Sequence, residues 1–241
     1  MSKKKSGVIY ILPNIFTASS IFAGVISIIN SINGDFVTAS WLIMLALIFD
    51  GLDGRVARLT NTCSRFGVEF DSLADLVAFG VAPALLLYMY AGHDYGRVGI
   101  VIAALFVIFG AIRLARFNVM TSQVEPSVFI GVPIPTAAVF VSILILLFEK
   151  YEVLHNFSYI LLGLSALVSL LMVSNIRYPS FKKFNFSKRY ALRLFVLLLC
   201  LALGIFIYPI EGFALIFIVY ILYGLVRAGI NMNKRSINIK D

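Results

Sequence analysis

The sequence predicts an all-α polytopic membrane protein with about eight transmembrane helices, and three observations support this prediction. Apolar residues make up 61% of the 241 residues, and only 13% are charged. A soluble globular domain has roughly 45–50% apolar and about 25% charged residues. The apolar residues also gather in runs of about 20, the length that an α-helix needs to cross a bilayer. We therefore expect a single integral membrane domain over residues 1–241.

Eight segments have the length and composition of a spanning helix. They are residues 12–32, 37–57, 70–91, 97–119, 133–149, 155–174, 190–208 and 210–231. Only the turn at Tyr208-Pro209 separates the last two segments, which predicts a tight helical hairpin. Pro126, Pro133 and Pro135 precede the fifth segment or lie at its start, and proline in a helix interior removes a backbone hydrogen bond. We therefore expect a loop or a broken helix between the fourth and fifth spans.

The basic residues predict the orientation of the chain in the membrane. With eight spans, the loops alternate between the two sides and both termini share one side. Eighteen of the 20 basic residues fall on that side: Lys3, Lys4, Lys5, Arg55, Arg58, Arg65, Arg113, Arg116, Arg177, Lys182, Lys183, Lys188, Arg189, Arg193, Arg227, Lys234, Arg235 and Lys240. Only Arg97 and Lys150 fall on the other side. Because Lys and Arg are enriched in cytoplasmic loops, we expect both termini in the cytoplasm.

The charge distribution argues against a nucleic-acid-binding protein, and the cysteine content argues against a disulfide-bonded framework. The net charge is +8, but the basic residues lie in short loops rather than along a stripe interleaved with aromatic residues. That distribution does not indicate nucleic acid as a partner. Cys63 lies in a polar loop and Cys200 in the middle of an apolar run, so we expect no disulfide.

Four aspartates lie around the loop between the second and third predicted spans. Asp50 and Asp53 are three apart near the end of the second span, and Asp71 and Asp75 are four apart at the start of the third. Residues three or four apart share one face of a helix, and the loop folds the two helices into a hairpin. We therefore expect one pocket of four carboxylates at the cytoplasmic end of the bundle. Ionisable groups near a bilayer are costly and mark functional sites.

Such a pocket is suited to metal ions. Four neighbouring carboxylates repel one another, and a divalent cation compensates their charge. Oxygen ligands favour Mg²⁺, with Mn²⁺ or Ca²⁺ as alternatives, and two ions fit four carboxylates better than one. Zinc is not expected, because His93 and His155 fall on the opposite side of the membrane. The alternative, ordinary boundary charges paired to nearby arginines, does not account for four aspartates at these spacings.

Small residues accompany the first aspartate pair. Gly54 and Ala57 lie on the same predicted helix, where the lack of bulk lets a ligand or another backbone approach closely. Arg58 lies one turn beyond Gly54 and can hold a phosphate through two hydrogen bonds. Carboxylate-bound metals beside this surface suit a pyrophosphate substrate.

These residues form a recognisable pattern. It reads Asp50-x-x-Asp53-Gly54-x-x-Ala57-Arg58, eight residues, Gly67-x-x-x-Asp71-x-x-x-Asp75. The pattern resembles the signature of the CDP-alcohol phosphotransferase family at every fixed position. The resemblance implies a dinuclear metal centre on the four aspartates, with Asp75 also acting as general base on the acceptor hydroxyl. It implies that Gly54, Ala57, Arg58 and Gly67 help to hold the CDP-lipid, and that the protein is a homodimer.

Three further stretches resemble the membrane-integral phosphatidylserine synthases of that family. They are residues 12–17, 113–118 and 129–135, and with the signature they extend the resemblance over roughly the first 180 residues. The last two spans, about 190–231, are recognisable only as apolar helices. The resemblance implies metal-assisted transfer of a phosphatidyl group from CDP-diacylglycerol to L-serine, in the cell membrane, with the active site facing the cytoplasm. Asn14 and Thr17 lie in the first stretch, where nucleotide contact and helix capping both remain open.

The second stretch contains candidate ligands for serine. Arg113 and Arg116 are three apart near the end of the fourth span, where a cation could hold the carboxylate of an amino acid. Asn118 could bond to that carboxylate or to the amine. The alternative is that the two arginines are topology charges that bind lipid headgroups.

Two other functions remain open at this point. A sibling transferase that uses glycerol 3-phosphate or an inositol phosphate would carry the same signature, although a phosphorylated acceptor needs more positive charge. A cation-coupled transporter would also carry intramembrane carboxylates. Transporter sites usually lie near the midplane between repeats, whereas these aspartates lie at one end of the predicted helices.

Overall fold

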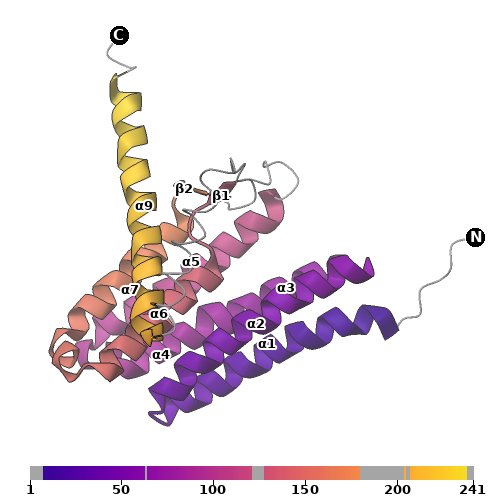
Figure 1. Cartoon of the computed structure of the whole chain (residues 1–241), viewed down its shortest axis with the longest axis horizontal. Coiled ribbons are helices and arrows are strands. Elements are labelled where there is room, and N and C mark those ends of the chain that lie inside the picture. The colour runs from indigo at the N-terminus through magenta and orange to yellow at the C-terminus, as the bar shows by residue number, and fades with distance from the viewer. Residues whose placement is uncertain (1–7, 63, 121–127, 180–203, 205–206, 238–241) are drawn as a thin grey trace, which may run out of the picture.

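Long helices dominate the computed structural model, which describes residues 8–62, 64–120, 128–179, 204 and 207–237 (Figure 1). The helices are α1 (Val8–Ile32), α2 (Phe36–Thr60), α3 (Arg65–Asp75), α4 (Ala82–Tyr90), α5 (Arg97–Met120), α6 (Ile134–Lys150), α7 (Ser158–Val173) and α9 (Pro209–Ile237). A π-helical segment, η1 (Leu76–Val81), joins α3 to α4, and two 3₁₀ turns, η2 (Gly92–Tyr95) and η3 (Glu152–Phe157), precede α5 and α7. Strands β1 (Val128–Ile130) and β2 (Arg177–Pro179) form a short antiparallel ribbon.

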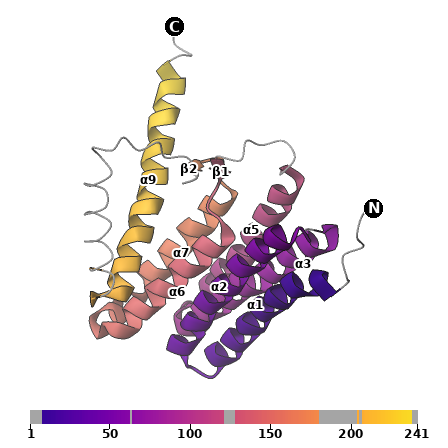
Figure 2. The ribbon, with the colours of Figure 1, turned by 45° about the vertical axis from the view of Figure 1, so that its right-hand side comes forward.

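Helices α1 and α2 form an antiparallel hairpin along one side of the bundle (Figure 2). Gly34 turns the chain with a φ of +83°, and the Asp35 side chain then accepts a hydrogen bond of 3.0 Å from the Thr38 amide to cap α2. Hydrogen bonding from the Thr38 side chain, and from this amide, holds the pKa of Asp35 below its usual value. Across the hairpin, the Ser27 hydroxyl donates to the Ala39 carbonyl at 2.8 Å. This buried bond fixes α1 against α2.

The third predicted span is one unbroken helical stretch from Arg65 to Tyr90. The Ser64 side chain begins it by accepting a hydrogen bond of 3.0 Å from the Gly67 amide. The π-helical turns of η1 start directly after Asp75. Such turns are rare and often lie at functional sites, because they change the direction in which the following side chains point.

The core lies around α6, of whose 17 residues 12 are buried. Its neighbours include α2, α4, α7 and α9. On the outside of the bundle, large apolar side chains remain exposed, among them Phe22 (68% exposed) and Leu73 (62%). A soluble monomer rarely exposes so much apolar surface, whereas in a membrane this surface contacts lipid. The protein is therefore an integral membrane protein.

The helices match the predicted spans closely where the structure describes them. Five segments are long and apolar enough to cross a membrane: Ile11–Ile32, Phe36–Thr60, Arg65–Tyr90, Arg97–Val119 and Glu152–Val173. Pro209–Ile221 is a shorter apolar helix, and α6 has 17 residues. The predicted span 190–208 lies almost wholly outside the described residues, as do the two cysteines expected to remain unpaired, Cys63 and Cys200. The all-α class is thus confirmed in the described part, apart from the short ribbon.

Strand β1 of the ribbon lies in the region predicted as a loop or broken helix, whereas β2 follows α7. Strand β1 pairs with β2 in the register Phe129 to Tyr178. Beyond it, Gly131 has a φ of +76°, and its amide donates to the Ile176 carbonyl at 2.9 Å. A Cβ at this position would lie 2.3 Å from the Met172 carbonyl oxygen, so the close approach to the end of α7 requires glycine. The absence of helix over residues 128–133 confirms that part of the prediction.

Polar and aromatic contacts hold the end of the bundle that lies opposite this ribbon. Glu211, at the start of α9, accepts hydrogen bonds from the Lys150 ammonium and from the Tyr151 hydroxyl at 2.6 Å. The contact with Glu211 raises the pKa of Tyr151. Tyr90 packs edge-on against Phe36 at 5.1 Å between ring centroids. These contacts tie α9 to the end of α6, and α4 to the start of α2.

Candidate metal and nucleotide site

Three aspartates converge where α2 ends and α3 begins. One carboxylate oxygen from each of Asp50, Asp53 and Asp71 lies within 4.8 Å of the others. Asp53 is buried, and the other two are half-buried. The expected hairpin therefore brings both aspartate pairs to one end of the bundle.

Asp75 lies beside this three-aspartate group, one helical turn beyond Asp71. The Asp50 carboxyl interacts closely with the carboxyls of both Asp71 and Asp75. Ionised carboxylates that share a site repel one another, and a proton or a cation between them relieves that repulsion. Within the described residues, Oδ1 of Asp71 and Oδ1 of Asp75 are buried without a hydrogen-bond partner. Orphaned carboxylate oxygens in an all-oxygen donor set fit a hard divalent cation.

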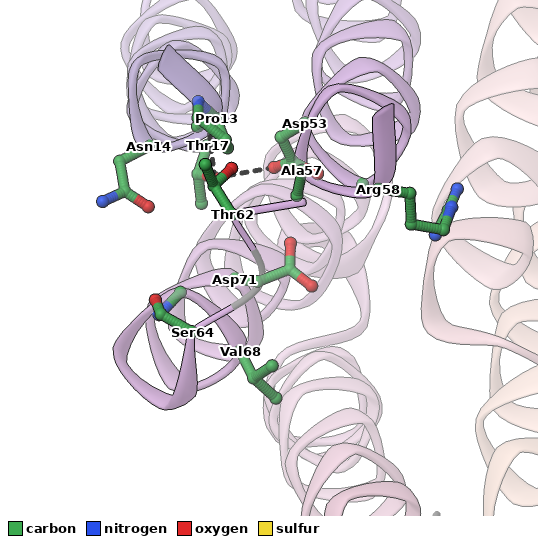
Figure 3. Close-up of a pocket in the computed structure, with 12 residues that line it drawn as sticks. Pro13, Asn14, Thr17, Asp53, Ala57, Arg58, Thr62, Ser64, Val68 and Asp71 are labelled. Atoms are coloured by element: carbon green, nitrogen blue, oxygen red, sulfur yellow. Dashed lines mark hydrogen bonds between the residues drawn. The ribbon is translucent and has the colours of Figure 1, made fainter. Parts of the chain in front are cut away.

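Asp53 is held differently from its neighbours. The Thr17 hydroxyl on α1 donates a hydrogen bond of 2.7 Å to Oδ2 of Asp53 (Figure 3). Asn14 and Thr17 both lie inside α1, which begins at Val8, so neither of them caps this helix. Of the two interpretations left open for these residues, helix capping is therefore wrong.

A pocket of about 200 Å³ opens beside Asp53 and Asp71. All six residues predicted to hold the CDP-lipid line it: Asn14, Thr17, Gly54, Ala57, Arg58 and Gly67. The helices α1, α2 and α3 each contribute to the lining (Figure 3). The structure therefore brings together the residues of the first stretch and those of the signature. Contact with a nucleotide remains a prediction.

The pocket is also lined by four residues that the aspartate signature did not identify: Pro13, Thr62, Ser64 and Val68. Thr62 and Ser64 fall in the eight-residue spacer between Arg58 and Gly67, whose residues the signature leaves unspecified. Thr62 is buried, and its hydroxyl lies 2.6 Å from that of Thr60. The capping preference of serine before a helix was the one sequence signal that could have identified Ser64.

The two signature glycines leave room on this surface. A Cβ at Gly67 would lie 3.2 Å from the Ser64 hydroxyl oxygen and 3.8 Å from Oδ1 of Asn14. A Cβ at Gly54 would lie 3.4 Å from Nη1 of Arg58. Gly51, on the same helix, has no atom within 4 Å of the corresponding position. Gly54 and Gly67 therefore differ from Gly51 in having neighbouring side-chain atoms within 4 Å of the place where a Cβ would lie.

Arg113 faces the aspartates from α5. Its half-buried guanidinium interacts electrostatically with Asp75 and with Tyr220 of α9, and lies 5.3 Å from the centre of the Phe117 ring. Within the described part of the chain it forms no ion pair shorter than 4.0 Å. A cation near Asp75 with no direct carboxylate partner is suited to binding an anionic group.

Arg116 and Asn118, the other two residues predicted to bind serine, already have protein partners. Arg116 donates to Oδ1 of Asn175 at 2.6 Å and to the Val173 carbonyl at 3.4 Å. The Asn118 amide donates to the Ser72 hydroxyl at 2.9 Å, which joins the end of α5 to α3. The structure thus places all three residues at the same end as the aspartates, with only Arg113 directed toward Asp75.

The family model of the CDP-alcohol phosphatidyltransferases matches residues 10–172, from the first helix to the end of α7. The chain belongs to this family. The match includes the whole aspartate cluster and the pocket beside it, so the cluster is consistent with a metal site of the CDP-alcohol phosphatidyltransferases. Helix α9, including Tyr220, lies beyond the matched residues.

Individual relatives are similar over most of their length. A protein of Helicobacter pylori strain J99, named CDP-diacylglycerol–serine O-phosphatidyltransferase, is 53% identical over 91% of both chains. A protein of the same name from Methanocaldococcus jannaschii is 36% identical over 86% of this chain and 92% of its own. An archaetidylserine synthase from Methanothermobacter thermautotrophicus is 39% identical over 74% of each chain.

Proposed function

We propose that this protein transfers a phosphatidyl group from CDP-diacylglycerol to the hydroxyl of L-serine, which yields phosphatidylserine and CMP. The observation that carries the proposal is the 53% identity, over 91% of both chains, to the Helicobacter pylori enzyme named for that reaction. The complete aspartate signature at one end of the helices supports the same chemistry. One domain over residues 1–241 performs it.

The four aspartates hold two divalent cations, Mg²⁺ or Mn²⁺, with Ca²⁺ as a less favoured ion. Oxygens of Asp50, Asp53 and Asp71 lie within 4.8 Å of one another, and within the described residues one oxygen of Asp71 and one of Asp75 are buried without a hydrogen-bond partner. Bound cations would neutralise the charge of the pyrophosphate and of the departing CMP.

The pocket between α1, α2 and α3 holds the CDP end of the donor. Gly54 and Gly67 let the pyrophosphate and nucleoside approach the helix backbones, and Arg58 binds phosphate oxygen through its planar guanidinium. The acyl chains remain in the surrounding lipid. The pocket therefore positions the phosphorus that carries the diacylglycerol beside the aspartates.

Asp75 accepts the proton of the serine hydroxyl. The serine oxygen attacks the phosphorus that carries the diacylglycerol, the bond from that phosphorus to the bridging oxygen breaks, and CMP leaves with the electron pair. Arg113, beside Asp75, binds the serine carboxylate. Arg116 and Asn118 complete the serine pocket, either by holding α5 in place or by exchanging their present partners for serine. Positioning and charge stabilisation supply most of the rate.

The site faces the cytoplasm, with eight spans and both termini on that side. Contacts between the end of α5 and α3, and between the end of α5 and Asn175 beyond α7, support an arrangement in which these ends lie on one side of the membrane. Arg55, Arg58, Arg65, Arg113 and Arg116 lie at that end, and the positive-inside rule favours the cytoplasmic side for it. A homodimer in the cell membrane follows from the family resemblance.

Acceptor-dependent release of CMP tests the function. Purified protein is incubated with CDP-diacylglycerol, Mg²⁺ or Mn²⁺ and one acceptor at a time: L-serine, glycerol 3-phosphate or an inositol phosphate. We expect CMP with L-serine alone and none after chelation of the metal. Release with a phosphorylated acceptor instead would assign the protein to a sibling activity. No CMP with any acceptor would favour the transporter alternative.

A further inference from the structure

We propose that Thr17 is a positioning residue for the metal ligand Asp53, and that it acts from α1 through a buried hydrogen bond rather than by touching the nucleotide. The inference rests on the proposed function of the aspartate cluster as a metal site. It gives the first helix a role in the metal centre, although α1 contributes no carboxylate to it.

The hydrogen bond is short and shielded from solvent. The Thr17 oxygen lies 2.7 Å from Oδ2 of Asp53, with Thr17 3% exposed and Asp53 6% exposed. The only other acceptor that this hydroxyl reaches among the described residues is the Pro13 carbonyl at 3.2 Å. A hydroxyl has one proton, and bonds to a charged carboxylate are shorter and stronger than bonds to a neutral carbonyl. The proton of Thr17 therefore points at Asp53.

The bond fixes the orientation of the Asp53 carboxylate. Oδ2 accepts from Thr17, and one oxygen of the same carboxylate lies within 4.8 Å of an oxygen of Asp50 and of Asp71, so this orientation sets how Asp53 meets a cation shared with them. Rotation of the carboxylate would break a buried bond. Partners that hold ligating groups in this way typically contribute 10- to 100-fold to metal affinity.

The support behind Thr17 is rigid. Ten residues further along α1, Ser27 is bonded to the Ala39 carbonyl of α2, the helix that carries Asp53. A Cβ at Gly24 would lie 2.8 Å from Cα of Ala78, so α1 also lies directly against η1. The position of Thr17 relative to Asp53 is therefore determined by helix packing and not by the side chain alone.

Asn14 and Thr17, three residues apart, have separate tasks. Asn14 lines the pocket, and its Oδ1 lies 3.8 Å from the point where a Cβ of Gly67 would stand. Thr17 is almost fully buried, and its only proton is committed to Asp53. The nucleotide contact predicted for both residues is thus assigned to Asn14 alone.

Binding of Mn²⁺ tests the proposal without relying on turnover. The full-length protein in detergent is titrated with Mn²⁺, and free ion is measured by electron paramagnetic resonance, for the wild type and for Thr17→Val, Thr17→Ser and Ser20→Ala. We expect Thr17→Val to bind Mn²⁺ 10- to 100-fold more weakly and Thr17→Ser to stay within about threefold of the wild type, since serine keeps the donor. Ser20 is buried one turn further along α1 without a hydrogen-bond partner in the described part of the chain, so Ser20→Ala should bind as the wild type does.

Three outcomes of this titration decide whether Thr17 positions Asp53. Weaker binding in Thr17→Val, recovered in Thr17→Ser, supports the proposal, and the KM for CDP-diacylglycerol at saturating Mn²⁺ should then be nearly unchanged. Unchanged Mn²⁺ affinity in Thr17→Val with a raised KM for CDP-diacylglycerol would overturn it in favour of nucleotide contact. A wild type that binds no Mn²⁺ would overturn the metal site itself, and with it the role given to Thr17.

Discussion

The guanidinium of Arg116 donates a hydrogen bond of 2.6 Å to the side-chain oxygen of Asn175, just beyond the end of α7. Arg113, three residues earlier on α5, has no such partner among the described residues and faces Asp75 instead. Two arginines that look equivalent in the sequence therefore occupy different environments. Arg116 holds the end of α5 to the segment that leads into β2, whereas Arg113 lies near Asp75.

This difference predicts that Arg113→Ala will weaken serine binding selectively. Loss of a charge-assisted hydrogen bond costs about 1.5–3 kcal/mol, so we expect the KM for serine to rise roughly 10- to 100-fold. The KM for CDP-diacylglycerol should change little. Arg97→Ala, an exposed arginine at the other end of α5, is the matched control and should behave as the wild type does. An unchanged KM for serine in Arg113→Ala would remove Arg113 from the serine pocket.

We expect Arg116 to stabilise the fold through its hydrogen bond to Asn175. Arg116→Ala and Asn175→Ala each remove one partner of the same bond, so their effects on thermal unfolding in detergent should not add in the double variant. A double-mutant cycle measures this coupling. Additive losses of stability would show that the pair makes no net contribution.

Asp75→Asn tests the assignment of the general base. The substitution keeps the shape of the side chain but removes its capacity to accept a proton, and loss of a general base typically costs 10²- to 10⁴-fold in turnover. We expect CMP release to fall by that amount while the protein still binds CDP-diacylglycerol. Glu69→Gln, an exposed carboxylate on the same helix, makes the same change of charge away from the cluster. Turnover near the wild-type rate in Asp75→Asn would assign the proton to another acceptor.

The aspartate cluster was predictable because its geometry is local. Asp50 and Asp53 share a helix face, as do Asp71 and Asp75, and a short loop leaves two apolar helices little choice but to pack as a hairpin. The helix-scale apolar runs likewise located the described helices to within a few residues at most ends. The features that the sequence did not predict depend on contacts between residues far apart in the chain.

Thr17 and Arg116 illustrate that limit. The spacing of Thr17 gives no sign that its hydroxyl reaches a residue 36 positions away, and the partner of Arg116 lies 59 positions away. The ribbon between β1 and β2 depends on a pairing between segments about 50 residues apart, each only three residues long. Short strands and single side-chain bonds of this kind have no periodic signal, so only the packed structure reveals them.

The two signature glycines should be sensitive to added bulk, and Gly51 should not. An extra methyl in a closely fitted site costs about 1–3 kcal/mol, so Gly67→Ala should raise the KM for CDP-diacylglycerol about tenfold or more. Gly54→Ala should have a smaller effect, because the atom it approaches is the end of the flexible Arg58 side chain. Gly51→Ala has open space and serves as the control. Equal KM values for all three variants would show that the donor does not approach these backbones.

Gly131→Ala should destabilise the fold without touching the aspartates. The residue has a φ of +76°, which costs an L-residue about 1–2 kcal/mol, and the new Cβ would stand 2.3 Å from the Met172 carbonyl oxygen. Relief of that contact requires the turn to move away from the end of α7. Thermal unfolding in detergent should show a clearly lowered midpoint, whereas Gly163→Ala, exposed on α7 with no atom within 4 Å, should match or exceed the wild type because alanine favours helix. A Gly131→Ala variant as stable as Gly163→Ala would mean that the turn between β1 and α6 does not depend on this close approach.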